Sequence, residues 1–247
     1  MKLIIEKNKE YAFQSFFMRL KLEGKRRSTM FKFLEIPDEL IKKVGMLLGK
    51  EKDGILYEET KSEVSELFDK LWKSKEKETE SVLGLLNESV KKYDNWLIRQ
   101  PPIFTGIPWH YEEVFVYPNI HSWATKAGNY ISVGITPSHF LREELVPVLI
   151  HELVHINTDQ VKLDYLKYPQ DSDEIANTLL TNKIIQAMNK QFNILVPDLK
   201  LAAPFREYNK YANDLAKIVE NADNFSSVAE KVDQFLISKA HLEIYKK

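Results

Sequence analysis

The segment VPVLIHELVHINT, residues 146–158, predicts a buried helix. Most of its residues are apolar, and among them stand two histidines and a glutamate, at His151, Glu152 and His155. An unpaired charge inside a protein is costly, because it loses its hydration without gaining a partner. Any fold of this chain must therefore provide partners for these three side chains. Pro147 further requires the helix either to begin near that position or to kink there.

A metal ion would satisfy all three side chains. The histidines are four residues apart, so their imidazoles lie one turn above each other on a helix and can reach one ion. Glu152 stands beside the first histidine, where it can lie near a water activated by the metal and act as a general base. Because the chain has no cysteine, any metal site must consist of His, Asp or Glu.

The sequence HELVH resembles the HExxH motif of the zincin metallopeptidases and, within them, the gluzincin branch. In that branch a glutamate on the following helix is the third ligand, commonly after eighteen intervening residues. Eighteen residues separate His155 from Glu174 in this chain. The resemblance, which covers about residues 129–182, implies that Zn²⁺ is bound by His151, His155 and Glu174, with Glu152 as the general base.

Asp173 is the alternative third ligand. In some related peptidases the ligand is followed four positions later by Asp or Asn, as Asp173 is followed by Asn177. Glu174 is favoured because a glutamate reaches further and its spacing matches the branch. The metzincin branch requires Gly and His where this chain has Thr158 and Val161, and peptide deformylases require a cysteine ligand. A site of two histidines and a glutamate also accepts manganese, cobalt or iron, so zinc rests on the resemblance.

The implied activity is hydrolysis of peptide bonds in a peptide or protein substrate. Peptidases of this type usually have a further donor that stabilises the oxyanion of the tetrahedral intermediate. The candidates are Tyr208, Tyr211 and His241, and no motif chooses among them. The remaining histidines, His110, His121 and His139, are interpreted as surface or core residues.

Two other functions compete with a peptidase. The chain could be a binding or regulatory protein that keeps a metal-bearing helix without turnover, and the lack of an identifiable oxyanion donor supports this alternative. The motif could also be coincidental in a helical interaction module. The spacing of Glu174 argues against coincidence.

The rest of the sequence predicts an α+β fold that is mainly helical. EEVFVYPNI at 112–120 and NYISVGITP at 129–137 are rich in β-branched and aromatic residues, and they predict a small antiparallel sheet immediately before the motif helix. Residues 61–96 have approximately helical spacing around the polar segment KSKEKETES, which predicts an antiparallel helical pair. Further helices are predicted at 37–49, 140–159, 173–192 with Ser172 as its cap, 205–219 and 226–238.

Three prolines and a glycine in QPPIFTGIPWHY predict the end of the helical region. We therefore expect a helical N-terminal region over residues 1–100 and a zincin-like region over 101–247, which can also form one compact domain. The apolar run at the N-terminus stops at Glu6, and no stretch approaches the roughly twenty apolar residues of a membrane span. With a net charge of -1, the expectation is a cytoplasmic protein that binds neither membrane nor nucleic acid.

Overall fold

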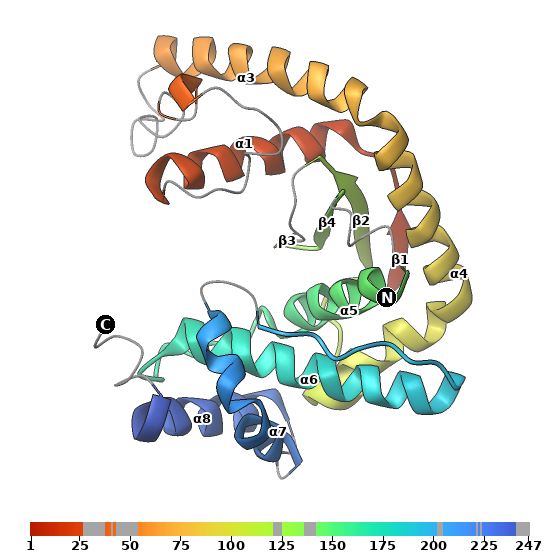
Figure 1. Cartoon of the computed structure of the whole chain (residues 1–247), viewed down its shortest axis with the longest axis vertical. Coiled ribbons are helices and arrows are strands. Elements are labelled where there is room, and N and C mark those ends of the chain that lie inside the picture. The colour runs from red at the N-terminus through yellow and green to blue at the C-terminus, as the bar shows by residue number, and fades with distance from the viewer. Residues whose placement is uncertain are drawn as a thin grey trace. The chain divides into compact units, whose positions relative to one another are not determined.

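A computed structural model of the chain is mostly helical with one small sheet, in agreement with the predicted α+β class (Figure 1). The described residues are 1–26, 38–40, 42, 54–120, 125–135, 142–201, 205–220, 222 and 224–240. The helix predicted at 37–49 lies largely outside these ranges, and His121, His139 and His241 lie outside them entirely.

Two compact units make up the chain, and each combines segments that are distant in the sequence. The first unit consists of Met1–Leu3, Ser89–Val114 and Arg142–Lys247, and the second of Ile4–Glu88 and Phe115–Leu141. The boundary predicted between residues 100 and 101 lies inside a helix, in the part of that helix that belongs to the first unit. The unit that contains the HELVH segment therefore also contains residues from the predicted N-terminal region.

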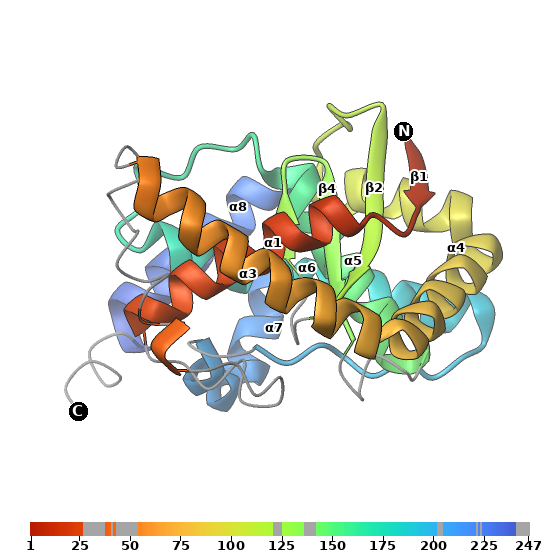
Figure 2. The same cartoon turned by 90° about the horizontal axis from the view of Figure 1, so that it is seen from above.

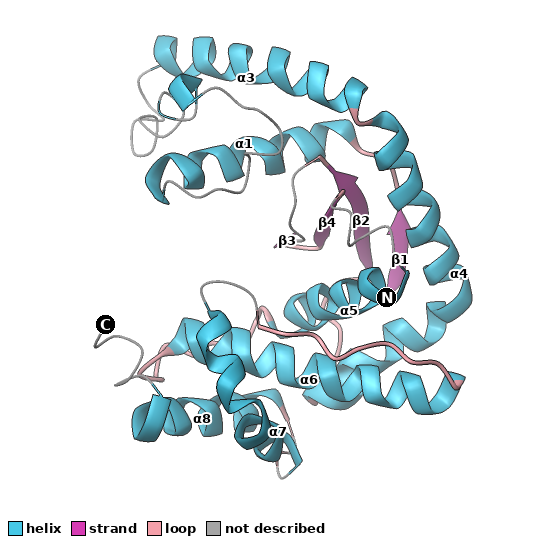
Figure 3. Ribbon diagram, viewed as in Figure 1, coloured by secondary structure: helices cyan, strands magenta, loops and turns pink. Residues whose placement is uncertain are grey.

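One four-stranded mixed sheet is formed by β1 (Lys2–Ile5), β2 (Glu113–Asn119), β3 (Thr125–Ala127) and β4 (Tyr130–Gly134), in the order β1-β2-β4-β3 (Figure 3). β2 and β4 are parallel, with Phe115 opposite Tyr130, whereas β3 and β4 are antiparallel. The predicted antiparallel pairing of the two long strands is therefore wrong. The short strand β3 explains the difference. The chain reverses at Gly128, where φ is 56°, so that β3 and not β2 forms the antiparallel pair with β4.

In the second unit, helix α1 (Lys9–Arg26) packs against helix α3 (Gly54–Ser74). The rings of Phe16 and Phe68 lie 5.4 Å apart in this contact. After a break at Lys75, helix α4 (Glu76–Thr105) leads away from the end of α3 (Figures 1 and 2). The predicted antiparallel pairing within 61–96 is thus wrong, because almost all of the polar segment KSKEKETES is helical.

The helical region ends within QPPIFTGIPWHY as predicted, but helix α4 first continues through Pro101 and Pro102. Pro102 has no N–H, which leaves the carbonyl of Ile98 without its helical partner. The indole Nε1 of Trp109 donates to that carbonyl at 2.7 Å. The helix ends only at Gly106, where φ is 71°.

The first unit contains the helices that follow the sheet. They are α5 (Arg142–Thr158), α6 (Pro169–Phe192), the 3₁₀ helix η3 (Phe205–Tyr211), α7 (Ala212–Glu220), α8 (Phe225–Phe235) and the π-helical turn η4 (Leu236–Ala240). Helix α6 packs against both α5 and α8. The predicted helices agree with these except at the start of α6. Pro147 lies inside α5, which is one of the two predicted alternatives, whereas α6 begins at Pro169, so Ser172 is a buried residue within the helix and not its cap.

No helix within the described ranges combines the length and the hydropathy needed to cross a membrane.

Candidate metal centre

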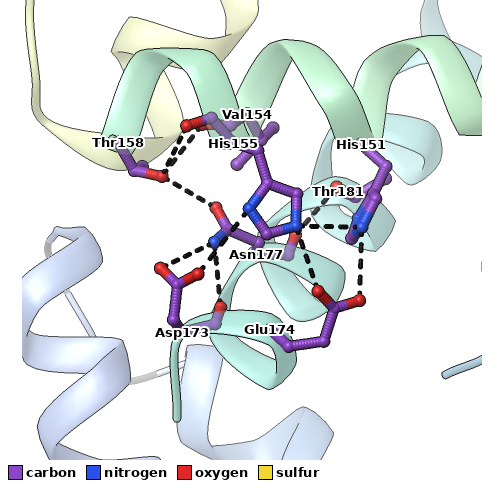
Figure 4. A network of polar contacts seen from close by, with 8 residues as sticks. All are labelled: His151, Val154, His155, Thr158, Asp173, Glu174, Asn177 and Thr181. Carbon is purple, nitrogen blue, oxygen red and sulfur yellow. Dashed lines mark hydrogen bonds and ion pairs between the residues drawn. The ribbon is translucent and has the colours of Figure 1, made fainter. Parts of the chain in front are cut away.

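The side chains of His151, His155 and Glu174 converge where α5 contacts α6 (Figure 4). His151 Nε2 lies 3.4 Å from one carboxylate oxygen of Glu174, and His155 Nε2 lies 3.2 Å from the other. The two Nε2 atoms are 3.1 Å apart. The three side chains therefore form a group that could hold a metal ion.

The local structure of the two helices explains this convergence. Leu149 and Leu153 of α5 are fully buried, so the helix is fixed in the core and its residues 151 and 155 lie one turn apart. Because α6 begins at Pro169, Glu174 lies in the second turn and not in the first turn as predicted. A carboxylate at that place reaches both imidazoles of the neighbouring helix.

The donor atoms fit a divalent cation. In a tetrahedral site with bonds of about 2.0 to 2.1 Å, donor atoms lie roughly 3.3 Å apart. The two Nε2 atoms are 3.1 Å apart, and each lies near a different oxygen of the Glu174 carboxylate, at 3.2 Å for His155 and 3.4 Å for His151. Two imidazole nitrogens and a carboxylate that point at one place need a proton or a cation between them, because lone pairs repel one another.

Charge effects within the group oppose those of burial. Burial alone would raise the pKa of the Glu174 carboxyl, but hydrogen bonds from His151 and His155 and their positive charge hold the pKa below its ordinary value. Burial alone would lower the pKa of His155, whereas the hydrogen bond to Glu174 and the charges of Glu152, Glu174 and Asp173 raise it. The site thus favours positive charge on its histidine side, which a bound cation can supply in place of protons.

Asp173 faces the other nitrogen of His155, with Oδ2 3.7 Å from Nδ1. The amide of Asn177 donates to Asp173 Oδ1 at 3.1 Å, and the hydroxyl of Thr158 donates to Asn177 Oδ1 at 3.0 Å (Figure 4). Asp173 therefore lies on the far side of the ring from Glu174. At 3.7 Å this is a contact between charges and not a hydrogen bond, so Asp173 favours this orientation of the His155 ring by its charge.

We expect Asp173→Asn and Glu174→Gln to differ in their effect on metal binding. Loss of a carboxylate that only orients His155 should weaken affinity about 10- to 100-fold. Loss of a direct ligand should weaken it further. Competition titrations with a chromophoric chelator measure both affinities. If Asp173→Asn loses more metal affinity than Glu174→Gln, Asp173 is the direct ligand and Glu174 is the residue that orients the histidine.

Glu152 lies on α5 beside the group. Its side chain is buried, with 7% of the residue exposed. It is three residues from His155, so the two are neighbours on the helix surface, and its negative charge contributes to the raised pKa of His155. The geometry places an acidic side chain next to the ligand group without making it part of that group.

The two candidate tyrosines have partners in the first unit. Tyr208 is 3% exposed, and its hydroxyl donates to Asp171 Oδ2 at 2.7 Å, in the first turn of α6. The ring of Tyr211 packs edge-on against Phe235, with centroids 5.5 Å apart. The structure thus gives the hydroxyl of Tyr208 a carboxylate partner at the start of α6.

Tyr208→Phe is expected to lower the free energy of unfolding by about 1 to 3 kcal/mol, because it removes a buried hydrogen bond to a carboxylate. The measurement is urea denaturation at fixed metal content. Hydrolysis should be retained, so a loss of kcat without a loss of stability would support Tyr208 as the oxyanion donor.

Sequence reasoning missed two hydrogen bonds that Asn157 makes near the end of α5. The buried Asn157 accepts a hydrogen bond from Thr105 Oγ1 at 2.5 Å and donates to the carbonyl of Ile107 at 3.0 Å. His110 Nε2 lies 2.8 Å from Asp159 Oδ1, so the structure gives this histidine a carboxylate partner. The available signal was Asn157, a polar residue outside HELVH in a mostly apolar segment, since such a side chain needs partners when it is buried.

The chain matches no protein-family model, and no curated protein or solved structure shows significant similarity to it. A group of two histidines and one glutamate occurs in several kinds of metal site. The likeness to gluzincins therefore depends on HELVH and on the spacing of Glu174.

Proposed function

We propose that this protein is a zinc-dependent hydrolase that cleaves peptide bonds in peptides or proteins. In this proposal His151, His155 and Glu174 are the ligands and Glu152 is the general base. The observation that carries it is the group of three donor atoms, all within 4.8 Å of one another, beside a buried glutamate. HELVH and the eighteen-residue spacing support the choice of zinc and of peptide bonds.

Each side chain has a defined role in the proposed reaction. Zinc, when bound, supplies Lewis acidity that polarises a carbonyl and promotes the deprotonation of water. The Glu152 carboxylate accepts the proton of the attacking water and returns it to the leaving nitrogen. Asp173 keeps the ring of His155 oriented with Nε2 toward Glu174. Because Glu152 is buried, its interaction with a developing charge is screened less than on the surface.

The test is cleavage of a peptide mixture of diverse sequence by the full chain loaded with one equivalent of zinc. Mass spectrometry detects new peptide ends. We expect new ends with zinc, none after treatment with a chelator, and recovery when zinc is restored. Zinc-loaded protein that produces no new ends would contradict the proposed activity.

A metal-binding protein without turnover is the second candidate. The contact of Tyr208 favours it, since the hydroxyl of this candidate oxyanion donor donates to Asp171. This candidate predicts near-stoichiometric zinc in the purified protein and no cleavage in the same assay.

A further inference from the structure

Helix α6 begins without a side-chain cap of its own. Tyr168 occupies the N-cap position and makes no capping hydrogen bond with its side chain, and Pro169 follows. The first amides of a helix need acceptors from elsewhere. A carboxylate on α8 accepts from the N-cap amide and from the amide before it: Asp233 Oδ1 accepts from the main-chain nitrogen of Tyr168 at 2.8 Å, and Oδ2 accepts from that of Lys167 at 3.2 Å.

Asp233 is a buried group, with 6% of the residue exposed. The hydroxyl of the fully buried Ser172 donates to its Oδ1 at 3.4 Å, which adds a third contact. A buried carboxylate is tolerated where hydrogen-bond donors surround it, and it is favourable at the positive end of a helix. These contacts therefore fix the position at which α6 starts.

The residues that Asp233 contacts, Lys167, Tyr168 and Ser172, immediately precede two residues of the metal centre in the sequence. Ser172 is followed by Asp173, which faces His155 Nδ1, and by Glu174, which faces both Nε2 atoms. A ligand site needs its donors held to within about 0.5 Å. A shift at the start of α6 would move both carboxylates relative to α5.

We propose that Asp233 is a positioning residue of the metal centre, which sets the affinity for the metal from a third helix by fixing the start of α6. The proposal rests on the proposed function only in requiring that His151, His155 and Glu174 bind zinc. It does not require that the protein cleave peptides.

A matched control lies one turn away on the same helix. Glu230 of α8 accepts a hydrogen bond from the hydroxyl of Tyr165 at 2.9 Å, and this contact is exposed. This contact joins α8 to the same connection between α5 and α6, but it does not involve the amides that Asp233 binds. Its removal tests whether any contact between α8 and this connection affects the affinity for zinc.

The experiment compares the full-length wild type with Asp233→Asn, Asp233→Ala and Glu230→Gln. Zinc affinity is measured by competition with a chromophoric chelator, and the ligand set by the visible absorption of the Co²⁺ form. We expect Asp233→Ala to weaken zinc binding by up to about 10- to 100-fold, which is the effect of removing a residue that contacts a metal ligand directly. Asp233→Asn, which keeps one acceptor, should lose less. Glu230→Gln should change affinity less than about threefold, because exposed contacts contribute little.

The Co²⁺ absorption should keep its wild-type intensity in Glu230→Gln and should change in Asp233→Ala, because there the Glu174 carboxylate is displaced relative to the histidines. Wild-type zinc affinity in a folded Asp233→Ala variant would overturn the proposal and leave Asp233 as a helix cap alone. If Asp233→Ala does not fold, unchanged affinity in Asp233→Asn has the same meaning. Zinc binding without peptide cleavage in the wild type would contradict the proposed activity and leave this proposal standing.

Discussion

Glu152→Gln is expected to abolish measurable peptide hydrolysis while zinc content stays at the wild-type level. Glutamine has the size of glutamate but cannot take up the proton of the attacking water. General-base catalysis contributes about 100- to 10,000-fold, so kcat should fall by at least that range. Initial rates on a peptide that the wild type cleaves, with zinc determined by mass spectrometry on the same sample, give both quantities.

An exposed glutamate provides the control for this substitution. Glu66 lies on the surface of α3, so Glu66→Gln removes the same charge without touching the ligand group. It should leave both rate and zinc content unchanged. Hydrolysis that survives in Glu152→Gln would remove Glu152 from the mechanism, and loss of zinc in that variant would instead make it a ligand or a structural support of the site.

His155→Ala is expected to abolish stoichiometric zinc binding. The substitution removes one of three donors and leaves the carboxylate of Glu174 with a single histidine partner. The loss should exceed the roughly 10- to 100-fold effect of changing an outer contact. Metal analysis of protein purified without chelator tests this directly. Thermal unfolding gives a second readout, because zinc at about 1,000 times its Kd stabilises a protein by roughly 4 kcal/mol.

His110→Gln is the matched control for the loss of a histidine. His110 pairs with Asp159 outside the ligand group, so zinc content should remain at the wild-type level in this variant. Added zinc should raise the melting temperature of the wild type and of His110→Gln but not that of His155→Ala. A zinc-dependent shift that persists in His155→Ala would place the metal elsewhere.

The grouping of the three side chains could be anticipated because it depends on short-range geometry. Two histidines four residues apart must lie on one face of a helix, and the connection to α6 is short enough for α5 and α6 to be neighbours. The exposure of each donor and the place of Asp173 could not be anticipated. They depend on where α6 begins, and that start is held by Asp233 of α8, which is distant in the sequence.

The errors in the predicted fold have the same physical origin. The pairing of β2 with β4 could not be read from the strands, because the short strand β3 occupies the antiparallel position beside β4. Pro102 is tolerated inside α4 because Trp109 satisfies the carbonyl that the missing N–H leaves exposed. Local propensity gives the tendency of a segment, whereas a partner elsewhere in the chain decides its structure.

The dependence of α6 on Asp233 has a consequence for the order in which the protein is assembled. Synthesis proceeds from the N-terminus, so both histidines and Glu174 leave the ribosome before α8 does. Until α8 has been made, the amides of Lys167 and Tyr168 lack the carboxylate that receives them. A nascent chain therefore contains the three proposed ligands before it can hold them in place, and the proposed metal site is complete only after α8 has docked.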